Sequence, residues 1–219
     1  MNKTSYFPLL IAVALGPLAA SAQPVSVGVR GGIHLLGWYK NSPSGATGSV
    51  TGASARGVVG PYVSVRLPGN LALQLEGLRR GYGFKRATGG LATFTSHEES
   101  GSSWEIPALL VWRPDYQENG WQPYAGVGPA LRYVDASTVE IVRRPQILPT
   151  DPPARETRTT GHRGVGNMGV MATAGMERKW GPVKFSAELR YAYWTATVLL
   201  RDVAPHHNQV SILFGFGSR

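Results

Sequence analysis

The chain has 219 residues, which predicts a single domain, and it contains no cysteine, which excludes disulfides and a lipid-modified cysteine. Hydrophobic residues make up 42% and aromatic residues 10%, so a disordered chain is excluded. The net charge is +9. An excess of basic residues suits binding to nucleic acid or to an anionic lipid surface. The N-terminal residues predict export, which favours the lipid surface.

Residues 1–22 are predicted to be a cleaved signal peptide, with an uncleaved anchor as the alternative. Lys3 precedes a mostly apolar stretch, and Ala20-Ser21-Ala22 forms a small-residue cleavage site. The mature domain is then residues 23–219. Export makes nucleic acid an unsuitable partner, and we expect outer-membrane lipids and lipopolysaccharide instead.

Eight segments of the mature chain alternate apolar and polar side chains, which is typical of β-strands with one apolar face. The pattern is strictest in the seventh segment, whose fifteen residues would extend about 50 Å. In the fourth, the apolar stripe begins at Trp104 and ends at Trp112, as expected for a strand that crosses between two interfacial aromatic belts. In chain order the segments are residues 25–38, 57–67, 71–85, 104–113, 121–135, 164–179, 183–197 and 208–218.

The connections between these segments alternate in length. Those after the second, fourth and sixth are short, at residues 68–70, 114–120 and 180–182. Those after the first, third and fifth are long and polar and are expected to be irregular loops, at residues 39–56, 86–103 and 139–163. This order predicts an all-β fold, an eight-stranded antiparallel up-and-down transmembrane β-barrel, with short periplasmic turns and long outer loops. The first and last strands must pair, because lipid cannot satisfy an open sheet edge.

Four segments resemble the small outer-membrane β-barrel proteins of the OmpA/OmpX-like superfamily, often labelled porin family. They are WEIPALLVW (104–112), QPYAGVGPALRY (122–133), ELRYAY (188–193) and VSILFGFG (210–217). The resemblance implies a protein of the Gram-negative cell envelope that the outer-membrane assembly machinery inserts. Such chains usually end on an aromatic residue that serves in assembly, and here Phe216 is the nearest one to the C-terminus. We expect a monomer.

The polar faces of the eight segments are predicted to meet inside the barrel. Enclosed charges must be paired or solvated, so a salt-bridge network that plugs the barrel is the favoured interpretation. A narrow polar conduit lined by the same residues is the alternative, and a catalytic carboxylate pair is a third. The predicted interior residues are Arg30, Arg66, Gln74, Glu76, Glu105, Arg113, Arg132, Glu177, Lys184, Glu188 and Arg190.

Aromatic side chains near the segment ends are expected to form the two interfacial belts. The predicted belt residues are Trp38, Trp104, Trp112, Trp121, Tyr133, Trp180, Tyr191, Tyr193 and Phe216.

No catalytic, cofactor or metal site is predicted. His206 and His207 are adjacent, so they would point apart on an extended chain, and the histidines are expected to be solvated loop residues. Ser96-His97-Glu98 supplies the residue types of a lipid-modifying hydrolase, but three adjacent loop residues rarely assemble a triad. We therefore expect a protein that is not an enzyme.

The third long connection carries a cluster of arginines, Arg143, Arg144, Arg155 and Arg158. Either they belong to a solvated charged loop, or they bind phosphate groups of lipopolysaccharide or another anionic surface. The predicted function is a structural or surface-interaction role in the outer membrane. A narrow passive channel is the alternative, followed by a lipid-modifying enzyme.

Overall fold

A computed structural model describes most of the chain after residue 24. The described residues are 25–35, 42–44, 48–52, 57–89, 93–114, 120–145, 154–160, 166–195 and 207–218. The predicted signal peptide, residues 1–22, lies outside them. In the described part of the chain, no helix is long and apolar enough to cross a membrane.

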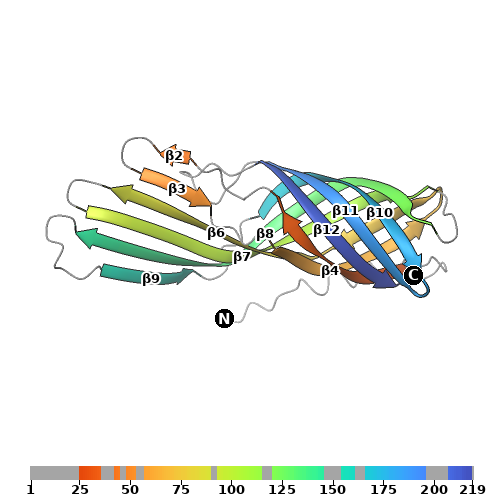
Figure 1. Cartoon of the computed structure of the whole chain (residues 1–219), viewed down its shortest axis with the longest axis horizontal. Coiled ribbons are helices and arrows are strands. Elements are labelled where there is room, and N and C mark those ends of the chain that lie inside the picture. The colour runs from red at the N-terminus through yellow and green to blue at the C-terminus, as the bar shows by residue number, and fades with distance from the viewer. Residues whose placement is uncertain are drawn as a thin grey trace, which may run out of the picture.

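An antiparallel barrel forms the body of the molecule (Figure 1). It closes because β1 pairs with β4 on one side and with β12 on the other, so the barrel has no open edge. β5 and β6 both pair with β4 and follow one another along the chain, so they count as one strand, the third around the barrel. The prediction of an eight-stranded barrel is confirmed. Its strands are β1 (Val25–His34), β4 (Gly57–Leu67), β5 (Leu71–Glu76), β6 (Leu78–Gly89), β7 (Thr93–Trp112), β8 (Gln122–Pro145), β10 (Gly166–Trp180), β11 (Val183–Trp194) and β12 (Asn208–Ser218).

The third position of the barrel is interrupted at Gly77, which separates β5 from β6. The Gly77 amide leaves the regular ladder and donates to the carbonyl of Pro61 in β4, 3.0 Å away. Gly60 faces this interruption, and a Cβ there would collide with the Gly77 carbonyl and the Leu78 Cα. The close approach of the two strands therefore requires glycine at position 60.

The described residues of the predicted short turns all lie at one end of the barrel. Gly69 and Asn70, between β4 and β5, have φ values of 73° and 63°, and Gly181, between β10 and β11, has a φ of 60°. These left-handed conformations suit glycine and asparagine, which is why such residues occupy the turns. Both ends of the barrel sequence lie here too, since the Ser26 hydroxyl donates to the carbonyl of Ser218.

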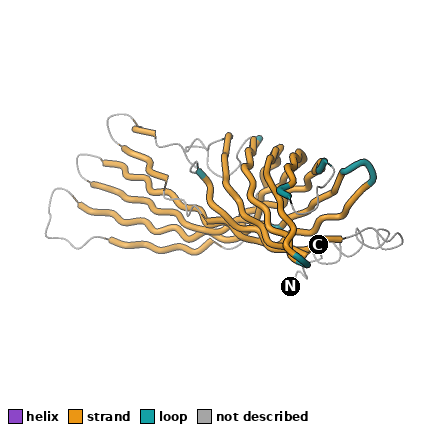
Figure 2. The backbone as a smooth tube through the Cα atoms, turned by 45° about the vertical axis from the view of Figure 1, so that its right-hand side comes forward, coloured by secondary structure: helices purple, strands orange, loops and turns teal. Residues whose placement is uncertain are grey.

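The three connections expected to be irregular loops contain β-strands instead. β6, β7 and β8 continue past the barrel, joined by β2 (Ser42–Ser44), β3 (Gly48–Gly52) and β9 (Ala154–Thr160) in the order β2-β3-β6-β7-β8-β9. We call this part the extended sheet. It starts where Gly81, Ser102 and Ala136 pair. The pairing of β7 with β8 shifts in register at the same place, between Ser102 and Ser103. Figures 1 and 2 show it projecting from the end opposite the short turns.

The expectation of loops was wrong for a physical reason. Outside the barrel neither face of the extended sheet is uniformly apolar. Polar residues predominate on both faces, although Val139, Ile141 and Val142 are apolar, so the period-two alternation is weak. Cross-strand pairs hold it instead, such as Lys85 and Glu98, whose Nζ and Oε2 are 2.9 Å apart.

The outer surface of the barrel is apolar. Branched aliphatic side chains such as Val29, Leu110, Val127 and Leu189 are each 45–55% exposed. The alternate positions along the same strands are buried and mostly polar. A barrel with its apolar side chains outside and its polar ones inside is arranged for lipid rather than for water.

Candidate functional site

A cluster of four charged residues fills the centre of the barrel. Arg190 grips Glu76 with both ends of its guanidinium group, Nη1 and Nη2, at 2.8 and 2.9 Å. Arg30 reaches the same carboxylate at 2.6 Å and the carboxylate of Glu188 at 3.0 Å. Arg190 also pairs with Glu188, which accepts a hydrogen bond of 2.8 Å from the Tyr124 hydroxyl. Two carboxylates and two guanidinium groups thus neutralise one another across the lumen.

A second cluster lies nearer the extended sheet, around Glu105. Its carboxylate pairs with Arg132 at 2.8 Å and with Arg80 at 3.4 Å. The amide oxygen of Gln209 accepts from both arginines and from the indole of Trp194, at 2.6, 3.0 and 3.2 Å. The guanidinium carbon of Arg132 lies 3.8 Å from the centroid of the Trp194 ring, so a cation–π contact supplements the ion pair.

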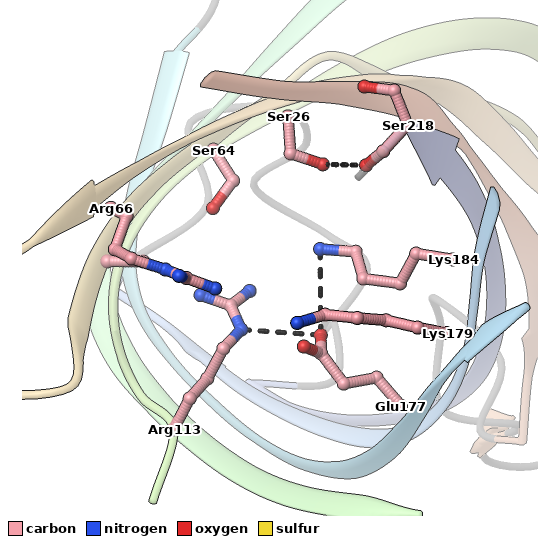
Figure 3. A pocket seen from close by; sticks show the side chains of 9 residues that line it. Ser26, Ser64, Arg66, Arg113, Glu177, Lys179, Lys184 and Ser218 are labelled. Atoms are coloured by element: carbon pink, nitrogen blue, oxygen red, sulfur yellow. Dashed lines mark hydrogen bonds and ion pairs between the residues drawn. The ribbon is translucent and has the colours of Figure 1, made fainter. Parts of the chain in front are cut away.

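The third cluster lies at the end with the short turns. Glu177 pairs with Arg113 at 3.3 Å and with Lys184 at 3.6 Å. Arg113 also donates to the amide oxygen of Gln74, 3.4 Å away, which connects this cluster to the central one. Arg66 lines the same mouth of the barrel (Figure 3).

The structure places every predicted interior residue in the lumen or at its mouth. Most are buried, whereas Arg113 is half-buried and Arg66 is exposed at the mouth. Periodicity could also have found Arg80, because it continues the inward series after Gln74 and Glu76, and the same holds for Gln209 in β12. Alternation also places Tyr124 and Trp194 on the inward face, but it does not identify the partners of their hydrogen bonds, Glu188 and Gln209.

The predicted belt residues that the structure describes fall into two groups along the barrel. Trp112, Trp121, Trp180 and Phe216 are exposed near the short turns, and Phe185 contacts two of them, with ring centroids 6.1 Å from Trp121 and 5.2 Å from Phe216. Toward the extended sheet lie Trp104, Tyr133, Tyr191 and Tyr193. Trp38 is outside the described residues.

The histidines differ from one another in environment. His34 lies within the first predicted strand and is 5% exposed, with its Nδ1 2.6 Å from the Ser211 hydroxyl inside the barrel. His207 is exposed, with its Nδ1 2.8 Å from the Trp194 carbonyl oxygen. His162 and His206 lie outside the described residues. Within the described part of the chain, no group of three His, Asp or Glu side chains could hold a metal ion.

Ser96, His97 and Glu98 lie on β7 within the extended sheet rather than in a loop. Successive side chains of a strand point to opposite faces, so His97 is directed away from both neighbours. Glu98 pairs with Lys85 across the sheet. These three residues therefore do not assemble a catalytic triad with one another.

The arginines of the third connection lie on β8 and β9. Arg143 and Arg155 are both exposed. Arg155 is the register partner of Val142, so Arg143 and Arg155 lie on opposite faces of the sheet. Arg144 and Arg158 belong to the same two strands, but their side chains are outside the described part.

Comparisons with known proteins identify the fold and nothing finer. No protein-family model matches the chain, and no curated protein matches it in sequence. The crystal structure of Neisserial surface protein A aligns with a TM-score of 0.50 and 14% identity, covering 90% of this chain and 99% of that one. The chain has the fold of a small outer-membrane β-barrel.

Two further solved structures align over similar lengths with lower scores. The N-terminal barrel of OprF from Pseudomonas aeruginosa gives a TM-score of 0.41 at 12% identity, covering 90% of this chain and 98% of that one. The attachment invasion locus protein Ail of Yersinia pestis gives 0.38 at 10%, covering 90% and 96%. The fold that the resemblance implied, a small outer-membrane β-barrel, is confirmed by the likeness to Neisserial surface protein A.

Proposed function

We propose that this chain is an integral outer-membrane protein with a closed barrel that holds the extended sheet outside the cell as a binding platform. The observation that carries the proposal is the division of the molecule into two parts with different surfaces. The barrel is apolar outside and charged inside, whereas polar residues predominate on both faces of the extended sheet.

The barrel part supports insertion in the outer membrane. Its apolar side chains lie between the two groups of aromatic residues, which suit the two interfaces of a bilayer. The short turns and both barrel termini share one end, as expected for the periplasmic side. The extended sheet at the opposite end would then stand in the external medium.

The ion pairs support a closed interior over a narrow channel. Glu76, Glu188, Glu105 and Glu177 each contact two cationic side chains, and the central cluster is neutral. The Glu76 and Arg190 side chains are 0% and 3% exposed, so water reaches this level very little. Ions would have to displace these pairs to pass. We favour the structural and surface-interaction role for this reason.

The extended sheet supports a binding role because it is built of paired strands. A platform fixed by cross-strand hydrogen bonds loses less conformational entropy on binding than a set of loose loops would. Arg143 lies ten residues beyond Tyr133, which corresponds to roughly 33 Å of strand. A position so far along the strand from the interfacial aromatic residues favours an extended anionic macromolecule, such as the sugar part of lipopolysaccharide, over lipid phosphates at the membrane surface.

Trimming the extended sheet should separate its role from that of the barrel. Gly83 pairs with Ser100, and Ser137 pairs with Thr160, so a two-residue Asn-Gly turn could replace residues 84–99 and residues 138–159. We expect the trimmed protein to fold in detergent, seen as heat-modifiable migration on gels, and to bind lipopolysaccharide and dextran sulfate about tenfold or more weakly in surface plasmon resonance.

The Arg178→Ser variant is the control, because Arg178 is exposed on the barrel wall near the short turns. It should bind like the wild type. Undiminished binding by the trimmed protein would show that the extended sheet is not the platform.

A further inference from the structure

The barrel mouth at the short-turn end encloses a small, strongly basic cavity. Its volume is about 50 Å³, and its described lining includes four basic side chains and one carboxylate, that of Glu177. The basic groups are Arg66, Arg113, Lys179 and Lys184, which converge from three sides in Figure 3. Arg66 belongs to β4, Lys179 to β10 and Lys184 to β11, and Arg113 directly follows β7, so closure of the barrel is what brings them together.

This mouth differs from the central cluster in its charge balance. At the centre, Glu76 and Glu188 are matched by Arg30 and Arg190. At the mouth, Glu177 is shared by two cations, Arg113 and Lys184. An excess of cations at a partly enclosed mouth favours the binding of an anion among them.

Two of these cations are arranged to grip an oxyanion. The side chains of Arg66 and Arg113 point toward one another, and the Ser64 hydroxyl faces the same space (Figure 3). A guanidinium group offers a planar fork of donors that matches carboxylate and phosphate oxygens. An anion between the two forks would relieve their mutual repulsion and receive hydrogen bonds from both.

A second, larger cavity shares Arg66 and Arg113 with the basic cavity and could hold the rest of a ligand. Its volume is about 350 Å³, and it is lined by the same Arg66 and Arg113 together with the turn residues Gly69 and Asn70 and with Pro114. The smaller cavity has space for a compact oxyanion, since a water molecule requires about 10–15 Å³ on this measure. The larger one would hold the group attached to it.

We propose that the mouth of the barrel at the short-turn end is a binding site for a phosphate group, gripped by Arg66, Arg113 and Lys184. The phosphate could be carried by a lipid headgroup of the adjacent leaflet or by a soluble phosphate ester. Both present the same tetrahedral dianion or monoanion to the arginines, and the rest of the ligand lies in the larger cavity. The site is separate from the extended sheet and does not depend on what that sheet binds.

Binding can be measured on the full-length mature chain folded in an uncharged detergent. Isothermal titration calorimetry with inorganic phosphate and glycerol phosphate tests the soluble source, and native mass spectrometry with short-chain phosphatidylglycerol tests the lipid source. The test variant is Arg66→Gln. Its control is Arg178→Gln, which removes the same charge from the exposed outer side of β10, next to Glu177.

We expect saturable binding of at least one probe, weakened about tenfold or more by Arg66→Gln, unchanged by Arg178→Gln and partly restored by Arg66→Lys. Binding of the soluble probes assigns the site to phosphate esters, and binding of phosphatidylglycerol alone assigns it to a headgroup. Absence of saturable binding to the wild type, or equal loss in both glutamine variants, would overturn the proposal. Heat-modifiable migration shows that each variant has folded.

Discussion

At the scale of single residues, the centre of the barrel depends on Glu76. Its side chain is fully buried, and it accepts hydrogen bonds from Arg30, Arg190 and Gln74. Burying such charges is costly, and their mutual attraction in a low-dielectric interior roughly offsets that cost. Removing one partner is different, because it leaves buried charges of one sign uncompensated.

We predict that Glu76→Gln lowers the free energy of unfolding by about 3 kcal/mol or more, because two buried guanidinium groups then share Glu188 alone. The matched control is Glu98→Gln, the same change in the exposed Lys85–Glu98 pair, whose side chains are 54% and 43% exposed. It should cost less than about 1 kcal/mol. Urea unfolding in phospholipid vesicles, followed by tryptophan fluorescence, measures both. Equal losses would contradict the central role of the buried cluster.

At the scale of elements, each barrel strand has one face of mostly apolar side chains that is expected to contact lipid. Leu189 lies midway along β11, pairs with Ala174 and Ile212, and is 54% exposed. Val183 begins the same strand on the same face beside the Trp180 turn and is 46% exposed. The two positions differ mainly in their depth below the membrane surface.

Arginine at these two positions should therefore have different effects. Leu189→Arg places a charge near the bilayer midplane and should cost about 2–4 kcal/mol, whereas Val183→Arg near the interface should cost about 0–1 kcal/mol. Refolding yield and urea unfolding in vesicles give the comparison. If the larger loss occurred at Val183, the assignment of depth along β11 would be wrong.

Strands could be predicted from the sequence where one face contacts lipid and the other faces the lumen, because the two faces then carry different kinds of residue. The alternation in residues 183–197 and 208–218 predicted β11 and β12 because each strand has one apolar and one polar side. Residues 93–102 and 137–145 gave no such signal, because polar residues predominate on both faces of the extended sheet. Register is also invisible to periodicity, so the partners of Glu105 and Gln209 could not be named before the strands were paired.

At the scale of the whole molecule, one continuous sheet serves two environments. β7 and β8 run 20 and 24 residues, several times the common strand length, and cross from the closed barrel into the open extended sheet. The register shift near Ser102 marks the transition. The proposed function therefore requires that the extended sheet and the short turns lie on opposite sides of the outer membrane.

Because the chain contains no cysteine, single cysteines can report this arrangement directly. Thr157→Cys places a thiol at an exposed position of β9 in the extended sheet, and Asn70→Cys places one in the exposed turn between β4 and β5. Each variant is expressed in Gram-negative cells and treated with a membrane-impermeant maleimide before and after the outer membrane is opened. We predict labelling of Thr157→Cys in intact cells and of Asn70→Cys only after opening; the reverse pattern would contradict the account.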